Sequence, residues 1–376
     1  MEQSVPSSRW QLTSGPLSTA VQEMVQRHED SLAEEFSDTK RRTELSDLVR
    51  QVGTRASEDR KQKLELHQAL NALYSLNFRI PAPGDPHPQF SPIIVEIAES
   101  LEKAFLDSLN QAIDTSCLED APEEAPKFRR WLIALVRSHP AFGHPYYKKF
   151  LIEDATKEDL RFFFTQESFL DARFDDVLAL LQLGTTGAVK NEIGRNFWDE
   201  LGNGDLSRVH TGLFAQSLRA LGITDDDLSG KGMAEALAQG NLSALLVLKR
   251  RHFYKAVGFL FVTEFLAPGR FKNVIKSGER NHLSDDALAY QRLHVAIDVI
   301  HAGGWMTNVI IPLVEKDPSV RHDIALGALY RLETSRQYLD MLYDLTRSRT
   351  RLSLATTHPD ERIPASERDT REVERR

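Results

Sequence analysis

Apolar residues recur along most of this chain with the spacing of amphipathic helices, and no segment shows the strict alternation of a β-strand. Between Glu58 and Leu76, for example, Leu66, Leu70 and Leu73 fall on one side of a helix. The same reasoning predicts helices over residues 58–76, 93–113, 127–138, 145–152, 157–183, 187–201, 206–221, 233–237, 251–266, 284–313 and 318–346. The pattern therefore predicts an all-α fold.

Three segments interrupt this pattern and suggest how the chain is organised. Residues 17–50 are polar with sparse apolar positions, which favours an exposed helix or a partly disordered extension. Four prolines in residues 81–90 prevent regular structure there, and we expect a connector over 81–92. Residues 347–376 are rich in Arg, Glu, Ser and Thr. We therefore expect an N-terminal helical extension (1–80), a core (81–346) and a disordered tail (347–376).

Composition narrows the function classes. The chain has 376 residues, 41% of them hydrophobic, and a net charge of −8, which gives no electrostatic case for binding nucleic acid or a membrane surface. Its single cysteine, Cys117, excludes an internal disulfide and argues against an iron–sulfur or thiolate-bound metal centre. We see no signal pattern and no apolar run of about 18 residues. We expect a cytoplasmic protein.

The segment QRLHVAIDVIHAGGW carries the most informative group of polar residues. His294, Asp298 and His301 are spaced i, i+4, i+7, so on a helix they lie on one face. Two imidazoles and a carboxylate can converge on one or two metal ions, and mixed nitrogen and oxygen donors suit iron or manganese. The flanking residues are apolar, and we expect the helix to be largely buried. The alternative is a pair of core histidines hydrogen-bonded to the aspartate.

Glu264 is the only acid in the apolar segment VGFLFVTEFLAPG. Phe261, Val262, Phe265 and Leu266 surround it on both sides, so an exposed position is disfavoured. A glutamate in such surroundings must be protonated, paired or bound to a cation.

Glu200 and His210 belong to the segment NFWDELGNGDLSRVH and lie ten residues apart. A straight helix would separate them by about 15 Å, too far to share a metal site. The glycines and Asn203 between them tolerate left-handed backbone conformations, so we predict a break over 201–205 that brings both side chains to one centre. The alternative is an ordinary helix end at Gly202, with a cap from Asp205 or Ser207 for the next helix.

Glu167 lies in RFFFTQESFLDARF, on a segment with a helical apolar stripe. It is a further candidate ligand, and Asp171 competes with it for the same role. A solvated acid on an amphipathic helix is the alternative.

Taken in chain order, these polar residues resemble the ligand pattern of the heme-oxygenase-like diiron oxidases and oxygenases, also called iron-containing redox enzymes. The order is Glu167, Glu200 with His210, Glu264, and then His294, Asp298 and His301. The resemblance covers about 159–343, and the segments NFWDELGNGDLSRVH and HVAIDVIH carry it most specifically. It implies a heme-oxygenase-like helical bundle, here with extra N-terminal helices. By this likeness the metal ligands are Glu167, Glu200, His210, Glu264, His294, Asp298 and His301.

The resemblance also implies a function. Members of this family hold two Fe(II) ions without heme, use O2 as co-substrate, and act on small molecules. The expected reactions are N-oxygenation, desaturation or carbon–carbon cleavage of an amino acid, amine or fatty acid. No catalytic residue beyond the metal ligands is expected, and electrons come from an external donor. We expect no nucleic-acid or membrane partner, and a homodimer is left open.

Two alternatives belong to other classes. A heme-oxygenase-like bundle could bind a ligand or partner without redox chemistry, in which case the polar residues would lie in separate hydrogen-bond networks. A heme-using relative needs a glycine-rich distal helix, which Gly184 and Gly187 match poorly. His139, His144 and the pair Glu279 and His282 lie beside helix breakers or in polar loops, and we expect them to be structural.

Overall fold

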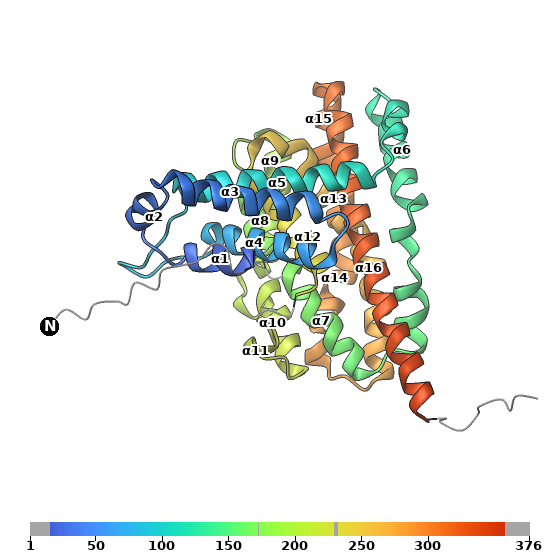
Figure 1. The fold of residues 1–376 in the computed structure, drawn as a ribbon. Helices are drawn as coiled ribbons and strands as arrows, with labels where there is room; N and C mark the ends of the chain where they lie inside the picture. The colour runs from blue at the N-terminus through green and yellow to red at the C-terminus, as the bar shows by residue number, and fades with distance from the viewer. Residues whose placement is uncertain (1–15, 172, 229–231, 358–376) are drawn as a thin grey trace, which may run out of the picture.

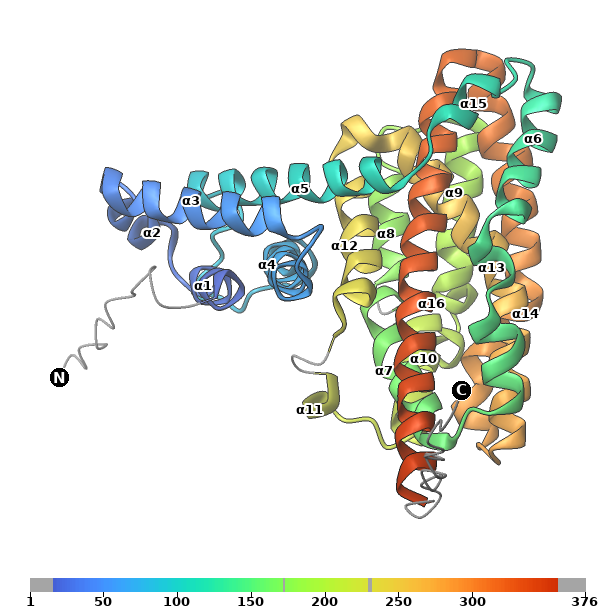
Figure 2. The same cartoon turned by 45° about the vertical axis from the view of Figure 1, so that its right-hand side comes forward.

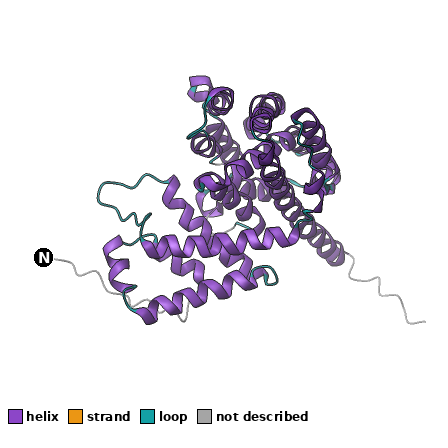
Figure 3. Ribbon diagram, turned by 90° about the horizontal axis from the view of Figure 1, so that it is seen from above, coloured by secondary structure: helices purple, strands orange, loops and turns teal. Residues whose placement is uncertain are grey.

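The computed structural model describes residues 16–171, 173–228 and 232–357. Within these ranges every regular element is a helix (Figure 3), which confirms the all-α prediction. The α-helices are α1 (Leu17–Met24), α2 (Glu29–Glu35), α3 (Thr39–Arg55), α4 (Arg60–Phe78), α5 (Pro92–Ala112), α6 (Ala125–Ser138), α7 (Lys157–Asp171), α8 (Phe174–Leu181), α9 (Gly187–Glu200), α10 (His210–Ala220), α11 (Asp225–Leu228), α12 (Ala234–Leu248), α13 (Phe253–Arg280), α14 (Asp285–Gly304), α15 (Ile311–Lys316) and α16 (Arg321–Thr357).

Helices α1 to α5 form a layer that projects from one side of an upright bundle (Figures 1 and 2). In this layer Leu45, Val49 and Val52 recur at helical spacing in α3 and are buried. Leu17 and Met24 of α1 are buried as well. The prediction of an exposed or partly disordered segment over 17–50 was therefore wrong. Its apolar positions are few but correctly spaced, so short helices bury one narrow stripe each.

The N-terminal layer shares its core with the bundle, because α4 packs against α12. Lys63 on α4 forms an ion pair of 3.0 Å with Glu235 on α12. The side-chain amide of Asn241 donates a hydrogen bond of 2.8 Å to the backbone oxygen of His67. Helix α5 packs along α3 and α4, so the helices on both sides of the expected boundary at residue 80 belong to one packed layer.

The long helix α13 lies at the centre of the bundle, between α14 and α16. The approach to α16 is close, since a Cβ atom on Gly258 would lie 1.8 Å from the backbone oxygen of Ile324. The predicted end at Leu266 was wrong, because α13 continues through Pro268 to Arg280. An interior proline costs a helix about 3 kcal/mol, and the burial of Phe271 and its neighbours against α14 offsets that cost.

Other boundaries also differ from the predictions. The segment predicted as one helix over 157–183 is two helices, α7 and α8. A π-helix, η7 (Trp305–Ile310), follows α14 and separates it from α15. The last helix, α16, continues to Thr357, so residues 347–357 are helical although a disordered tail was expected from 347. The rest of the expected tail, 358–376, lies outside the described residues.

The predicted break after Glu200 is confirmed. Helix α9 ends at Glu200, and Gly202, Asn203 and Gly204 then take left-handed φ angles of 65°, 57° and 86°. Extended backbone at Asp205 follows, and α10 begins at His210. This short reversal brings the end of one helix next to the start of another.

By length and composition alone, the stretch Asp285–Lys316 could cross a membrane. The buried core helix of a bundle meets the same criteria, and α14 packs against α10 and α13. One side of α14 buries His294 and His301, while Val299 and Ile300 on the other side are 59% and 58% exposed. The expectation of a largely buried helix therefore holds for one face only.

We predict that Gly202→Ala destabilises the protein by about 1–3 kcal/mol and weakens metal binding. The added Cβ would lie 2.7 Å from the backbone carbon of Arg208, in a conformation that side chains disfavour. Gly194→Ala is the control, since this glycine is inside α9 and its Cβ would meet nothing closer than 3.8 Å. It should raise stability slightly. Urea unfolding of both variants measures the effect, and equal stabilities would contradict the assignment of strain to Gly202.

Candidate metal centre

Six of the seven predicted ligands converge in the centre of the bundle, in two groups of three. In each group, one potential ligand atom from every residue lies within 4.8 Å of the others. The first group is Glu200, His210 and His294, and the second is Glu264, Asp298 and His301. All six side chains are buried. The alternative of polar residues in separate networks does not describe this arrangement.

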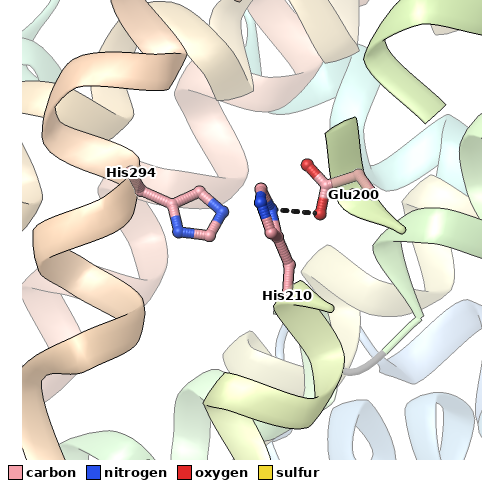
Figure 4. Close-up of side chains that lie close together, drawn as sticks. All are labelled: Glu200, His210 and His294. Carbon is pink, nitrogen blue, oxygen red and sulfur yellow. Dashed lines mark ion pairs between the residues drawn. The ribbon is translucent and has the colours of Figure 1, made fainter. Parts of the chain in front are cut away.

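The first group joins the two ends of the chain reversal to α14. Glu200 Oε2 lies 2.8 Å from His210 Nδ1, and the rings of His210 and His294 are 4.5 Å apart (Figure 4). The Nδ1 of His294 lies 2.7 Å from the backbone oxygen of Tyr290. When Nδ1 carries the proton of that hydrogen bond, Nε2 keeps its lone pair for a metal ion.

The second group joins α13 to α14. The Nδ1 of His301 lies 3.4 Å from Glu264 Oε2 and 3.9 Å from Asp298 Oδ1. This nitrogen is buried and makes no hydrogen bond, while Nε2 of the same ring lies 3.1 Å from a carboxylate oxygen of Asp199. The orientation suits a metal ligand, because one ring nitrogen is held by a carboxylate and the other faces the remaining ligands.

Burial and mutual charge shift the pKa values of these groups. Burial raises the pKa of Glu200, an effect that the neighbouring His210 opposes. Burial and the adjacent His210 hold the pKa of His294 well below its ordinary value. Burial by itself would lower the pKa of His301, but the carboxylates of Glu264, Asp199 and Glu200 raise it to about 9. The second group therefore concentrates negative potential, which a cation would relieve.

Other buried acids of the described chain show what is unusual here. Each has a Lys or Arg partner within 4.0 Å. These pairs are Glu102 with Lys249, Glu167 with Arg270, Glu192 with Arg195, Glu235 with Lys63, and Glu333 with Arg336. Within the described residues, no Lys or Arg forms an ion pair with Glu200 or Glu264, which contact histidines instead. Their charge calls for a different cation, and the donor set suits iron.

Glu167, the seventh predicted ligand, belongs to neither group. Its carboxylate lies 3.0 Å from the guanidinium of Arg270 and accepts a hydrogen bond of 2.8 Å from the hydroxyl of Tyr338. The sequence could not show these partners, because they come from two distant helices, α13 and α16. We therefore leave Glu167 out of the ligand set. The side chain of Asp171, its competitor, lies outside the described residues.

Two residues that support the centre were missed in the sequence. Asp199 contacts His301, and the side-chain amide of Asn196 donates a hydrogen bond of 3.3 Å to Glu264 Oε1. Asn196 and Glu200 are four residues apart on α9, so they share the helix face that points into the bundle. This spacing could have identified Asn196 from the sequence, because it places two polar residues on the face of α9 that packs in the core.

The residues set aside in the sequence analysis lie outside both groups. His139 accepts a hydrogen bond from the backbone nitrogen of Ala141 in a turn, and His144 pairs with Asp340 at 3.0 Å. Glu279 is on the surface and pairs with Arg292.

A cavity of about 570 Å³ adjoins the second group, with Glu264 in its wall. Its lining is mostly apolar, with contributions from α13, α14 and α16. This volume is within the range of sites that hold small metabolites.

Residues 161–336 match a protein family that is described as an iron-containing redox enzyme. The match spans α7 to the first half of α16, just under half of the chain, and contains both ligand groups. This similarity supports an iron-dependent oxidoreductase with a heme-oxygenase-like bundle. Among curated proteins, none matches the chain.

The family match and the geometry together assign a role to Asp199 that can be measured. We predict that Asp199→Ala weakens Fe(II) or Mn(II) binding about 10–100-fold, because it removes the carboxylate that orients His301. Asp226→Ala is the control, since Asp226 is exposed on α11. Metal titration of both variants provides the readout. Equal affinities would show that His301 does not need this partner.

For Glu167, we predict that Glu167→Gln lowers stability by about 1–3 kcal/mol while metal content stays unchanged. The amide weakens the contact to the partly buried Arg270 but leaves both ligand groups complete. Thermal unfolding and metal analysis of the same preparation separate the two effects. Loss of metal with unchanged stability would return Glu167 to the ligand set.

Proposed function

We propose that this protein is a non-heme diiron oxidase or oxygenase that uses O2. The observation that supports this proposal most strongly is the pair of adjacent ligand groups, each with at least one histidine and one carboxylate. One Fe(II) ion would be held by Glu200, His210 and His294, and the other by Glu264, Asp298 and His301.

The residues present fit two ferrous ions by charge and by donor type. Three carboxylates and three neutral imidazoles carry a total charge of −3 against the +4 of two Fe(II) ions. The buried Nδ1 atom of His301 makes no hydrogen bond and lies 3.4 Å from Glu264 Oε2 and 3.9 Å from Asp298 Oδ1, an arrangement that suits a nitrogen facing a metal ion. Two ferrous ions in this place would supply electrons and open coordination positions for the reduction of O2.

The chain's own residues prepare the site for this chemistry. Asp199 and Asn196 orient His301 and Glu264, and the backbone of Tyr290 fixes the ring of His294. The π-helix η7 directly follows α14 and begins with Trp305, which is fully buried. Burial of all six candidate ligands would limit the access of bulk water to the metal ions, while the cavity beside Glu264 leaves an approach for a substrate.

The proposed substrate is a small metabolite, either an amino acid, an amine or a fatty acid. The reaction is N-oxygenation, desaturation or carbon–carbon cleavage, and an external donor supplies further electrons. We also propose a cytoplasmic location. The sequence contains no dinucleotide-binding fingerprint that would indicate a built-in reductase. We therefore propose that the electron donor is a separate molecule.

Metal loading of single-site variants tests the proposal. We expect the protein to take up two Fe(II) ions per chain under anaerobic conditions and to consume O2 when exposed to it. His301→Ala and His294→Ala should each lose at least one ion and most of the O2 consumption, since each removes a donor from one group. His282→Ala is the control, because His282 lies in the turn after α13 and outside both groups.

Iron analysis and an oxygen electrode provide the readouts, with circular dichroism to show that each variant remains folded. A His301→Ala protein with both irons and full O2 consumption would overturn the proposal, and these histidines would then be ordinary hydrogen-bonded core residues.

A further inference from the structure

The route from the second ligand group to the protein surface is short on the side of the chain reversal. Nε2 of His301 lies 3.1 Å from Oδ2 of Asp199, whose side chain is 17% exposed. The other carboxylate oxygen of Asp199 accepts a hydrogen bond of 2.9 Å from the side-chain amide of Asn203, which is exposed. A single hydrogen-bonded residue therefore separates a candidate ligand from a side chain in solvent.

Large apolar side chains are exposed beside this route. Trp198 directly precedes Asp199 on α9 and is 50% exposed. A Cβ atom on Gly204 would lie 3.3 Å from the Trp198 ring, so the indole packs on the reversal itself. Leu206, two residues after Gly204 in the short helix η5 (Leu206–Arg208), is 89% exposed. Exposed apolar groups in one place are typical of a surface that a partner covers, and tryptophan is enriched at such surfaces.

The same segment carries an exposed cation. Arg208, at the end of η5, is exposed. The acid of the reversal, Asp205, is also exposed, and its carboxylate accepts hydrogen bonds from the backbone and the hydroxyl of Ser207. The arginine favours a partner with an acidic surface. We call Trp198, Asn203, Leu206 and Arg208 together the reversal surface.

The reversal surface is separate from the cavity beside Glu264. As far as the described residues go, none of its four members lines that cavity. A protein bound to the reversal surface and a small molecule in the cavity would therefore use different approaches to the ligand groups.

We propose that the reversal surface binds a small acidic iron–sulfur protein, which serves as the external electron donor. The proposal rests on the proposed function for the role of the iron. Each ferric ion takes up a single electron, which suits a carrier that delivers one electron at a time. In one encounter the reduced cluster loses one electron and one ferric ion becomes ferrous, and no covalent bond forms or breaks. Two encounters return both ions to the ferrous state.

The contact between Asp199 and His301 explains why the donor would bind here. Electron transfer between proteins slows steeply with distance, so a donor must bind where the acceptor lies close to the surface. The hydrogen-bonded path from His301 through Asp199 to Asn203 meets this requirement.

Binding of electron carriers to the full-length protein tests the surface, with and without iron. We expect a plant-type ferredoxin, which is acidic, to bind with roughly micromolar affinity, since complexes of electron carriers are small and short-lived. Raised salt should weaken this binding. Cytochrome c, a basic carrier, should bind at least about tenfold more weakly. Isothermal titration calorimetry measures both affinities, and equal or tighter binding of cytochrome c would overturn the assignment of an acidic partner.

Single substitutions test whether the reversal surface is the place of binding. Trp198→Ser should weaken ferredoxin binding about tenfold or more, and Leu206→Ser and Arg208→Gln about threefold each. Phe90→Ser and Arg130→Gln are matched controls, because both residues are exposed and lie on other parts of the chain, in the connector before α5 and on α6. Leu206 is almost fully exposed, so its variant remains informative if Trp198→Ser disturbs the fold.

The rate of iron reduction provides a second readout. Reduced ferredoxin should reduce the oxidised, iron-loaded protein more slowly in Trp198→Ser and Leu206→Ser, while dithionite, a small reductant, should reduce all variants at the rate of the unaltered protein. Stopped-flow absorption measures both rates. Absence of ferredoxin binding, or equal affinities in the surface and control variants, would overturn the proposal. A chain that binds ferredoxin through this surface but holds no iron would contradict the proposed function instead.

Discussion

The structure depends on how the core of a helical bundle accommodates carboxylates that the chain does not neutralise with Lys or Arg. Glu200 and Glu264 are buried and contact histidines, while five other buried glutamates each pair with Lys or Arg. An uncompensated buried carboxylate costs several kcal/mol, so these two must share a proton with their histidines or bind a cation. In the proposed function, two ferrous ions would neutralise these carboxylates and would also provide the reactive centre.

The same constraint explains the local irregularities of the fold. The left-handed residues after Glu200 allow His210 to return to the site, which a continuous helix would prevent. Pro268 lies within α13 only four residues after Glu264, in a helix that packing on both sides holds together. The π-helix η7 follows His301 by a few residues. These three departures from regular helix thus lie close in sequence to candidate ligands, as expected where local geometry serves a site.

Much of the site could be predicted from sequence because its signals are local. The spacing of His294, Asp298 and His301 placed three ligands on one helix face, and the glycines after Glu200 indicated the chain reversal. The role of Glu167 could not be predicted in this way. Its partners, Arg270 and Tyr338, lie on helices that are distant in sequence, so no local pattern indicates these contacts.

The same limit applies to the packing of the N-terminal helices. The helices in residues 17–50 each bury a narrow apolar stripe, which their polar average composition does not reveal. The neighbouring helices of the layer determine which face of each helix is buried. Helix ends were also misplaced where tertiary packing overrides a local signal, as at Pro268.

The central claim is that the two ligand groups each hold one iron. Anomalous X-ray diffraction at the iron absorption edge, from crystals of the Fe(II)-loaded protein, tests it most directly. The account predicts two separate peaks, one between Glu200, His210 and His294 and the other between Glu264, Asp298 and His301. A peak at one group alone, or iron bound elsewhere while both groups stay hydrogen-bonded without metal, would contradict it.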